Sequence, residues 1–202
     1  KLLGMKVELI ANMGAYLQII TPGIPLLGMF MYPAIYKMPT YEFDCTGVFT
    51  NTTPTDAIRG AGRPESTFAI ERIMDELAAE LDMDPMKLRE MNWITHEEFP
   101  YATVAGLTYD TGNYEAATAK AMELFGYDAL RAEQEQRRAS GDPVQLGIGI
   151  ARVVGQLWHR LTGKLLQSRH RIIRWPLCDG PMSVLPCHCK YRIVFNIKNE
   201  RR

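Results

Sequence analysis

The sequence has few cysteines and no long uninterrupted apolar run. Only 4 cysteines occur among 202 residues, and they form no framework typical of a secreted, disulfide-rich domain. Prolines and glycines interrupt the apolar stretch 19–36, so a buried irregular region is expected there and not a membrane span. The chain starts at Lys1 and shows no signal-peptide pattern. We therefore expect an internal fragment of a cytoplasmic protein.

Several common catalytic motifs are also missing. There is no Gly-x-Ser-x-Gly, no His-Glu-x-x-His, no phosphate-binding loop ending in Gly-Lys-Ser/Thr and no Gly-x-Gly-x-x-Gly fingerprint. These absences argue against the corresponding serine hydrolases, zinc peptidases, nucleotide hydrolases and dinucleotide-binding enzymes. His96, flanked by Glu97 and Glu98, is interpreted as an exposed surface group, with a metal site as the alternative. Cys45 is interpreted as a small buried residue.

Acidic residues are nearly absent from the last part of the chain. Residues 1–150 contain 12 Lys+Arg and 21 Asp+Glu, whereas residues 151–202 contain 11 Lys+Arg and 2 Asp+Glu. Such asymmetry marks a separate unit or a basic tail. We predict one partial domain over 1–150, followed over 151–202 by a basic tail that is frameshifted or disordered.

Two other functions of the tail are compatible with its residues. Trp158, Trp175 and Tyr191 are interleaved with its basic residues, a pattern that fits a non-enzymatic module in contact with nucleic acid. Its Cys and His side chains could bind a metal, but their spacing matches no standard zinc site. The residues concerned are Cys178, Cys187, His188 and Cys189.

The hydrophobic periodicity predicts an α+β fold with a mixed sheet. Expected strands cover 6–10, 16–20, 43–49 and 144–150, and expected helices cover 26–32, 64–81, 86–91, 114–125 and 128–139. Asp84 is the predicted N-cap of the third of these helices, and Gly126 is predicted to end the fourth. In the second, an apolar stripe at 3–4 spacing faces the core, and charged residues on the other side form a solvated face. The stripe is Ile70, Ile73, Met74, Leu77, Ala78 and Leu81, and the solvated face is Glu71, Arg72, Asp75, Glu76 and Glu80.

The chain is organised around a polar, glycine-rich loop over 50–65. Gly60 and Gly62 permit positive φ and close backbone approach. Arg59 and Arg63 carry planar, permanently charged groups that suit oxyanions, and a helix begins directly afterwards at Pro64. These features describe a pocket wall that tolerates anions. The alternative is a tight loop-to-helix connection in which both arginines pair with carboxylates.

Over about 6–150 the chain resembles the large, molybdopterin-binding subunit of the molybdenum hydroxylases, which include xanthine dehydrogenases, aldehyde oxidases and aerobic carbon monoxide dehydrogenases. Its order and spacing are similar to the branch like carbon monoxide dehydrogenase. The resemblance is carried by Thr50-Asn51-Thr52, Ala57-Ile58-Arg59-Gly60-Ala61-Gly62-Arg63-Pro64-Glu65, Ile70-Glu71-Arg72, Asp84-Pro85, Leu88-Arg89, Asn92, Thr111-Gly112-Asn113-Tyr114 and Leu146-Gly147-Ile148-Gly149-Ile150.

The resemblance implies a partial molybdopterin-binding domain and a molybdenum–molybdopterin cofactor, often in its cytosine dinucleotide form. In that family the pterin dithiolene holds the metal, so no side chain is expected to ligate it. Arg59 would orient substrate, and Gly60, Ala61, Gly62 and Arg63 would lie against the cofactor. Electrons would pass to an iron–sulfur small subunit carrying 2Fe-2S centres and to an FAD-binding medium subunit. The expected reaction is hydroxylation of an aldehyde or an N-heterocycle.

Three positions depart from the family pattern. Gly60 stands where carbon monoxide dehydrogenases carry a copper-binding cysteine, which argues against oxidation of carbon monoxide. Ile58 stands where an aromatic residue is usual. The family's general-base glutamate has no counterpart here, since Glu200 lacks its sequence context. The chain alone is therefore expected to be catalytically incompetent.

Overall fold

The computed structural model describes residues 1–152 in full, together with the backbone of two strands, 170–176 and 189–197. The strands in chain order are β1 Leu2–Gly14, β2 Thr40–Phe49, β3 Tyr101–Ala102, β4 Thr108–Tyr109, β5 Leu146–Arg152, β6 His170–Pro176 and β7 Cys189–Ile197. The helices are α1 Gly23–Met29, α2 Arg63–Glu80, α3 Pro85–Glu90, α4 Tyr114–Phe125 and α5 Tyr127–Ser140, with a 3-10 turn η1 at His96–Glu98. The predicted α+β class is confirmed.

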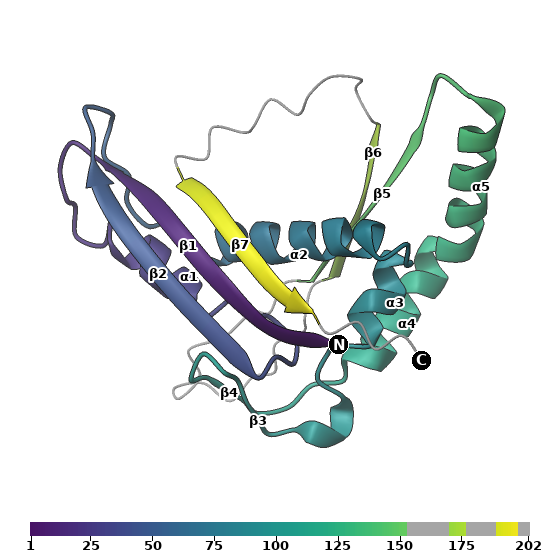
Figure 1. Ribbon diagram of the computed structural model, residues 1–202, viewed down its shortest axis with the longest axis horizontal. Helices are drawn as coiled ribbons and strands as arrows, with labels where there is room; N and C mark the ends of the chain where they lie inside the picture. Colours follow the sequence, from purple (N-terminus) through teal and green to yellow (C-terminus); the bar gives the residue numbers. More distant parts are fainter. Residues whose placement is uncertain (153–169, 177–188, 198–202) are drawn as a thin grey trace.

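The largest sheet is mixed and has the order β2-β1-β7. β1 and β2 are parallel, with Val7 opposite Phe43, and α1 lies in the connection between them. β7 pairs antiparallel with the other edge of β1. Because β1 and β2 are parallel, their carboxyl ends meet at one end of the sheet (Figure 1). The loops after β1 and after β2 therefore start side by side.

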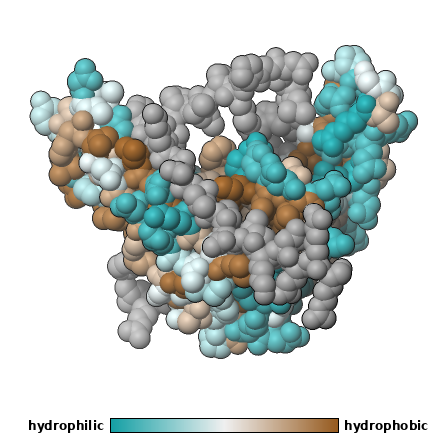
Figure 2. Space-filling view, in the orientation of Figure 1, coloured by the Kyte–Doolittle hydropathy of each residue, from teal (hydrophilic) through white to brown (hydrophobic). Residues whose placement is uncertain are grey.

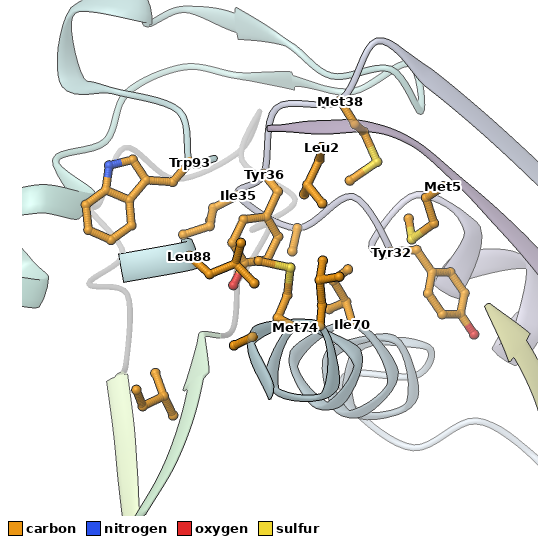
Figure 3. Packing of buried hydrophobic residues seen from close by; sticks show 14 of the residues in the cluster. Leu2, Met5, Tyr32, Ile35, Tyr36, Met38, Ile70, Met74, Leu88 and Trp93 are labelled. Carbon is orange, nitrogen blue, oxygen red and sulfur yellow. The ribbon is translucent and has the colours of Figure 1, made fainter. Parts of the chain in front are cut away.

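The core lies between this sheet and α2. Met5 and Val7 of β1 belong to one buried cluster with Ile70 and Met74 of α2. Figure 3 shows Ile70 and Met74 pointing from α2 toward Tyr36 and its neighbours. The predicted apolar stripe of this helix is thus confirmed, because its members are buried or packed against the cluster.

Two local predictions are wrong, and Cys45, interpreted as buried, is only half-buried in β2. Residues 16–20 form no strand, and Tyr16, Leu17 and Ile19 are exposed, because the chain turns at Gly14 with a φ of +74° and leaves the sheet. Glu71, assigned to the solvated face of α2, is only 3% exposed. Glu71 can be buried because polar and charged partners satisfy its carboxylate.

Those partners form a charged network inside the protein. The Arg89 Nε donates to Glu71 Oε2 at 2.8 Å, and the Tyr36 hydroxyl donates to Glu71 Oε1 at 2.8 Å. Arg89, fully buried, also donates to the carbonyls of Pro85 and Ile150 and pairs with Asp75. A buried carboxylate is tolerated only when its lone pairs are satisfied. This network ties α2, α3 and β5 together.

The C-terminal half of the described domain forms a second, smaller assembly. β5 pairs antiparallel with β6, and α5 packs against β5 (Figure 1). Gly126, at φ +67°, ends α4 and begins α5, as its position after the apolar periodicity predicts. Both β6 and β7 lie within 151–202, while Cys178, Cys187 and His188 lie outside the described residues. The domain boundary at 150 and the functions suggested for the tail stay predictions.

Candidate functional site

The loop between β2 and α2 begins with hydrogen bonds to the end of β1. The Thr50 amide donates to the Gly14 carbonyl, and the Ala15 amide donates to the Thr52 carbonyl, each at 3.0 Å. Asn12 Oδ1 accepts from the Thr50 hydroxyl at 2.7 Å and from the Gly14 amide at 2.9 Å. The polar residues at the start of the loop therefore join it to the neighbouring strand. These polar residues thus have a structural role.

A second set of bonds holds the middle of the loop. The buried Thr21 hydroxyl donates to the Thr55 carbonyl at 2.6 Å. Asp56 Oδ1 accepts from the Ile20 amide at 3.1 Å and from the Ala57 amide at 2.9 Å. The segment between β1 and α1 thus lies directly along the loop, although 34 residues separate Thr21 from Thr55.

Gly62 anchors the far end of the loop against α1. It is the N-cap of α2, with φ +81°, and it is buried. A Cβ atom at this position would lie 2.5 Å from the Gly28 amide nitrogen and 2.9 Å from the Ile24 carbonyl oxygen. The helix can approach this closely only because position 62 has no side chain. The Ser66 hydroxyl also donates to the Gly62 carbonyl, at 2.7 Å.

Between these anchors, residues 58–61 form the tip of the loop, in which Ile58 and Arg59 are exposed and Gly60 and Ala61 are half-buried. Two turn bonds shape it: the Ala61 amide donates to the Ile58 carbonyl at 3.0 Å, and the Arg63 amide donates to the Gly60 carbonyl at 2.9 Å. Ile58 is 85% exposed. Arg59 is exposed too, and within the described part of the chain its guanidinium forms no hydrogen bond or ion pair. The tip presents a permanent cation to the outside.

Gly60 leaves room for a group to approach this cation. Its φ is +94°, and a Cβ placed on it would meet no atom within 4 Å. Internal packing therefore does not require glycine here, in contrast to Gly62. An open glycine next to an unpaired guanidinium fits an anionic or oxygen-rich ligand that comes close to the backbone. A molybdopterin, with its phosphate and metal oxygens, has this character.

The five residues predicted for the site thus differ in environment. Arg59, Gly60 and Ala61 share the tip of the loop, whereas Gly62 is buried behind it and contacts α1. Arg63 is half-buried as the first residue of α2 and has an interaction of its own. The alternative in which both arginines pair with carboxylates does not hold for Arg59 within the described residues. Their roles toward a cofactor remain predictions.

Two hollows within the described residues differ in size and in position relative to the loop. A cavity of about 20 Å³ lies behind the tip, between α1 and α2, and one oxygen of Glu65 is buried there without a hydrogen-bond partner. That volume holds about one water molecule. A larger hollow of about 400 Å³ lies where α4 meets α5 and includes no residue of the loop. A cofactor at the loop would therefore lie against the outer surface of the tip.

Exposed apolar side chains gather at the end of the sheet from which the loop starts (Figure 2). Figure 2 shows hydrophobic residues gathered at the end of the sheet where β1 and β2 finish. In the segments that follow β1 and β2, including α1, the exposed large apolar residues are Tyr16, Leu17, Ile19, Ile20, Leu26, Leu27 and Ile58, and Phe49 ends β2. Patches of this kind mark binding surfaces. The described residues contain no group of three or more His, Cys, Asp or Glu suited to hold a metal.

Sequence reasoning missed the residues that hold the loop and the core together. Asn12, Thr21 and Asp56 act through partners distant in sequence, so no local pattern reveals them. Glu71 could have been found, because it lies three and seven residues before Met74 and Ala78 and so shares the buried side of α2. Burial raises the pKa of this carboxyl, opposed by Arg89 and by the Tyr36 hydroxyl. The network is structural, since no part of Arg89 reaches solvent.

The comparisons identify the family. Residues 1–93 match the model of the molybdopterin cofactor-binding domain. The chain is 38% identical over 154 residues to the carbon monoxide dehydrogenase large chain of Hydrogenophaga pseudoflava, covering 74% of this chain and 19% of that protein. It is 32% identical to the 6-hydroxypseudooxynicotine dehydrogenase complex subunit gamma of Paenarthrobacter nicotinovorans, covering 74% and 20%. The chain belongs to the family of molybdenum hydroxylase large subunits.

Solved structures agree with this family. The carbon monoxide dehydrogenase from Oligotropha carboxidovorans matches with a TM-score of 0.67 at 33% identity, covering 75% of this chain and 20% of that one. The quinoline 2-oxidoreductase from Pseudomonas putida 86 matches with a TM-score of 0.65 at 28% identity, covering 74% and 19%. The fold is thus a molybdopterin-binding fold of the family. The chain spans about a fifth of the length of the curated relatives it matches.

The family consists of molybdopterin-dependent oxidoreductases, and several relatives bear the names of large chains or large subunits. None of the helices that the structure describes combines the length and the apolar character needed to cross a bilayer.

Proposed function

We propose that this chain supplies one wall of a molybdenum–molybdopterin site in an oxidoreductase that hydroxylates an aldehyde or an N-heterocycle. The observation that carries the proposal is the tip of the loop, where Arg59 is exposed and unpaired within the described residues and stands beside an open Gly60. The match to a molybdopterin cofactor-binding domain over residues 1–93 supports molybdopterin as the ligand of this tip. When bound, the cofactor supplies the two-electron oxidation of an electron-poor carbon.

The residues of the tip have separate roles in this proposal. Arg59 donates hydrogen bonds to a substrate oxygen or nitrogen and orients it, because its guanidinium is planar and permanently charged. Gly60 and Ala61 let the cofactor approach the backbone, and Gly62 and Arg63 hold the tip at the start of α2. Gly60 offers no thiol for copper, so carbon monoxide is not the proposed substrate.

The wider assembly belongs to the same proposal. An iron–sulfur small subunit and an FAD-binding medium subunit would receive the electrons, the pterin would carry the cytosine dinucleotide extension, and the enzyme would be cytoplasmic. No general-base glutamate of the family is recognised in this sequence. We therefore expect the purified chain to show no dye-linked aldehyde oxidation. Clear turnover would contradict this part of the proposal.

A matched pair of glycine substitutions tests cofactor binding. Gly106, between β3 and β4, resembles Gly60 because its φ is also positive, at +86°, and a Cβ placed on it would likewise meet open space. Gly60→Leu and Gly106→Leu therefore impose similar local strain, but only the first blocks the tip. Each purified chain is incubated with molybdenum–molybdopterin and desalted, and retained pterin is measured by fluorescence and molybdenum by mass spectrometry.

We expect the wild-type chain and Gly106→Leu to retain pterin and Gly60→Leu to lose most of it. Equal retention by the two variants would show that the tip does not contact the cofactor. If the wild-type chain retained no pterin, the proposal that this segment binds the cofactor by itself would be wrong.

A further inference from the structure

The loop tip cannot hold its own position. Ile58 and Arg59 are exposed, and no neighbouring atom would restrain a side chain at Gly60. The tip has two internal turn bonds, which fix its local shape but not its direction relative to the sheet. Its direction must therefore come from the residues on either side.

On the β2 side, Asp56 joins two segments with one oxygen atom. Its Oδ1 accepts from the Ala57 amide, immediately before the tip, and from the Ile20 amide, 36 residues away in sequence. Asp56 itself is exposed. A carboxylate at this position thus serves as an acceptor between two backbones, in a geometry that a side-chain amide oxygen could reproduce.

Thr21 adds two further hydrogen bonds next to this junction. Its side chain is 1% exposed, its hydroxyl donates to the Thr55 carbonyl at 2.6 Å, and the same oxygen accepts from the Gln18 amide at 3.0 Å. The hydroxyl is therefore used both as a donor and as an acceptor. Loss of the hydroxyl would leave the Gln18 amide and the Thr55 carbonyl without these part-buried hydrogen bonds.

On the α2 side, Gly62 closes against α1 at the positions of Ile24 and Gly28. Apart from the bond between Asp56 and Ala57, these contacts on both sides of the tip come from residues 18–28. We propose that this segment is a clamp that positions Arg59, and that Asp56 and Thr21 are its positioning residues. The value of the clamp for cofactor or substrate rests on the function proposed above, whereas its mechanical action does not.

The clamp is tested by hydrogen exchange on the purified full chain without cofactor. The amides of Ala61 and Arg63 report on the tip, because both are hydrogen-bonded within it. Asp56→Ala removes both acceptor bonds, and Asp56→Asn keeps an oxygen in the same place. Asp110→Ala is the matched control, since Asp110 is also exposed and accepts only from the adjacent Thr111 amide.

We expect Asp56→Ala to speed exchange at the tip about tenfold, in line with the loss of two modest hydrogen bonds. Asp56→Asn should stay within about twofold of the wild type, Asp110→Ala should leave the tip unchanged, and all three should melt close to the wild type. Unchanged exchange in Asp56→Ala would overturn the clamp. So would exchange in Asp56→Asn as fast as in Asp56→Ala.

A second pair addresses Thr21, which is buried and more sensitive to substitution. Thr21→Ser keeps the hydroxyl, whereas Thr21→Val keeps the shape and loses it. Faster hydrogen exchange at the tip in Thr21→Val but not in Thr21→Ser supports the clamp. Equal exchange in the two variants contradicts it. The proposed function fails separately: if Gly60→Leu leaves pterin retention intact, the cofactor site is wrong while these exchange results still stand.

Discussion

Arg89 and Arg59 lie in opposite environments within the same domain. Arg89 is fully buried and bonded to the carboxylates of Glu71 and Asp75 and to three backbone carbonyls, so these bonds serve the fold. Arg59 is exposed at a loop tip and unpaired within the described residues. Both residues are present in the motifs that indicate the family. The surroundings of a motif arginine, and not its residue type, therefore decide whether it stabilises the fold or is available to a ligand.

The largest expected effect comes from breaking the buried network. Arg89→Ala leaves Glu71 and two carbonyls buried without their partner, so we expect a loss of about 3–5 kcal/mol in the free energy of unfolding, measured by urea denaturation. Arg72→Ala is the control, because Arg72 pairs with Glu76 on the surface of the same helix and should cost less than about 1 kcal/mol. Similar losses in the free energy of unfolding for Arg89→Ala and Arg72→Ala would show that the buried network contributes no more to stability than the surface pair.

The next effect separates the buried glycine of the loop from the open one. Gly62→Ala places a methyl group 2.5 Å from the Gly28 backbone, at φ +81°, and should cost about 2–3 kcal/mol. Gly60→Ala meets only the backbone strain of φ +94° and should cost about 1 kcal/mol. Thermal melts of both variants measure the difference. A smaller loss in Gly62→Ala would show that α1 can withdraw from the loop.

A smaller effect concerns Asp84, the N-cap of α3. Its Oδ1 accepts from the Met86 and Lys87 amides, and Asp84→Ala should cost about 1 kcal/mol at pH 7. Burial opposes ionisation of this carboxyl, but the Lys87 amide, the Tyr127 hydroxyl and Arg131 outweigh it and lower its pKa.

The sign of the pH dependence follows from that lowered pKa. The stabilisation is complete above the unfolded pKa, near 3.8, and is lost as pH falls through the lower folded value. Urea denaturation at pH 7 and at pH 3 should therefore show the gap between wild type and Asp84→Ala narrowing in acid. Asp84→Asn, which keeps the acceptor oxygen, should show a smaller gap. A gap that is equal at both pH values would mean that the ionised form is not favoured.

The smallest effect on stability is expected at the tip itself. Arg59→Ala removes no intramolecular bond within the described residues, so the free energy of unfolding should change by less than about 0.5 kcal/mol. Urea denaturation beside Arg89→Ala measures this directly. A loss above about 1 kcal/mol would show that Arg59 supports the fold and would weaken its assignment to substrate.

Local patterns sufficed for the helices and for most of the main strands. The stripe from Ile70 to Leu81 predicted α2, Asp84 predicted the start of α3, and Gly126 predicted the end of α4. Each of these signals lies within one or two turns of the structure it specifies. The sequence also located the loop, because Gly60 and its neighbours interrupt two regular elements.

Long-range partners could not be predicted in the same way. The spacing of Glu71 to Met74 and Ala78 indicates the buried side of α2, but it does not indicate that Arg89, 18 residues later, is the partner that makes this burial tolerable. Residues 16–20 are as apolar as a strand, but Gly14 turns the chain out of the sheet. The bond from Ile20 to Asp56 arises only once β1 and β2 lie in parallel. Such contacts form only after the fold brings distant segments together, so local sequence patterns do not reveal them.

The parallel pairing of β1 and β2 has a consequence for how such a protein can diversify. Backbone bonds to Gly14 and the glycine contact with α1 support the loop at its two ends, while residues 58–60 contribute no side chain to the core. A mutation at Ile58, Arg59 or Gly60 therefore changes what the molecule presents while leaving its folding largely untouched. A lineage could exchange one chemistry for another through these three positions and inherit the same scaffold.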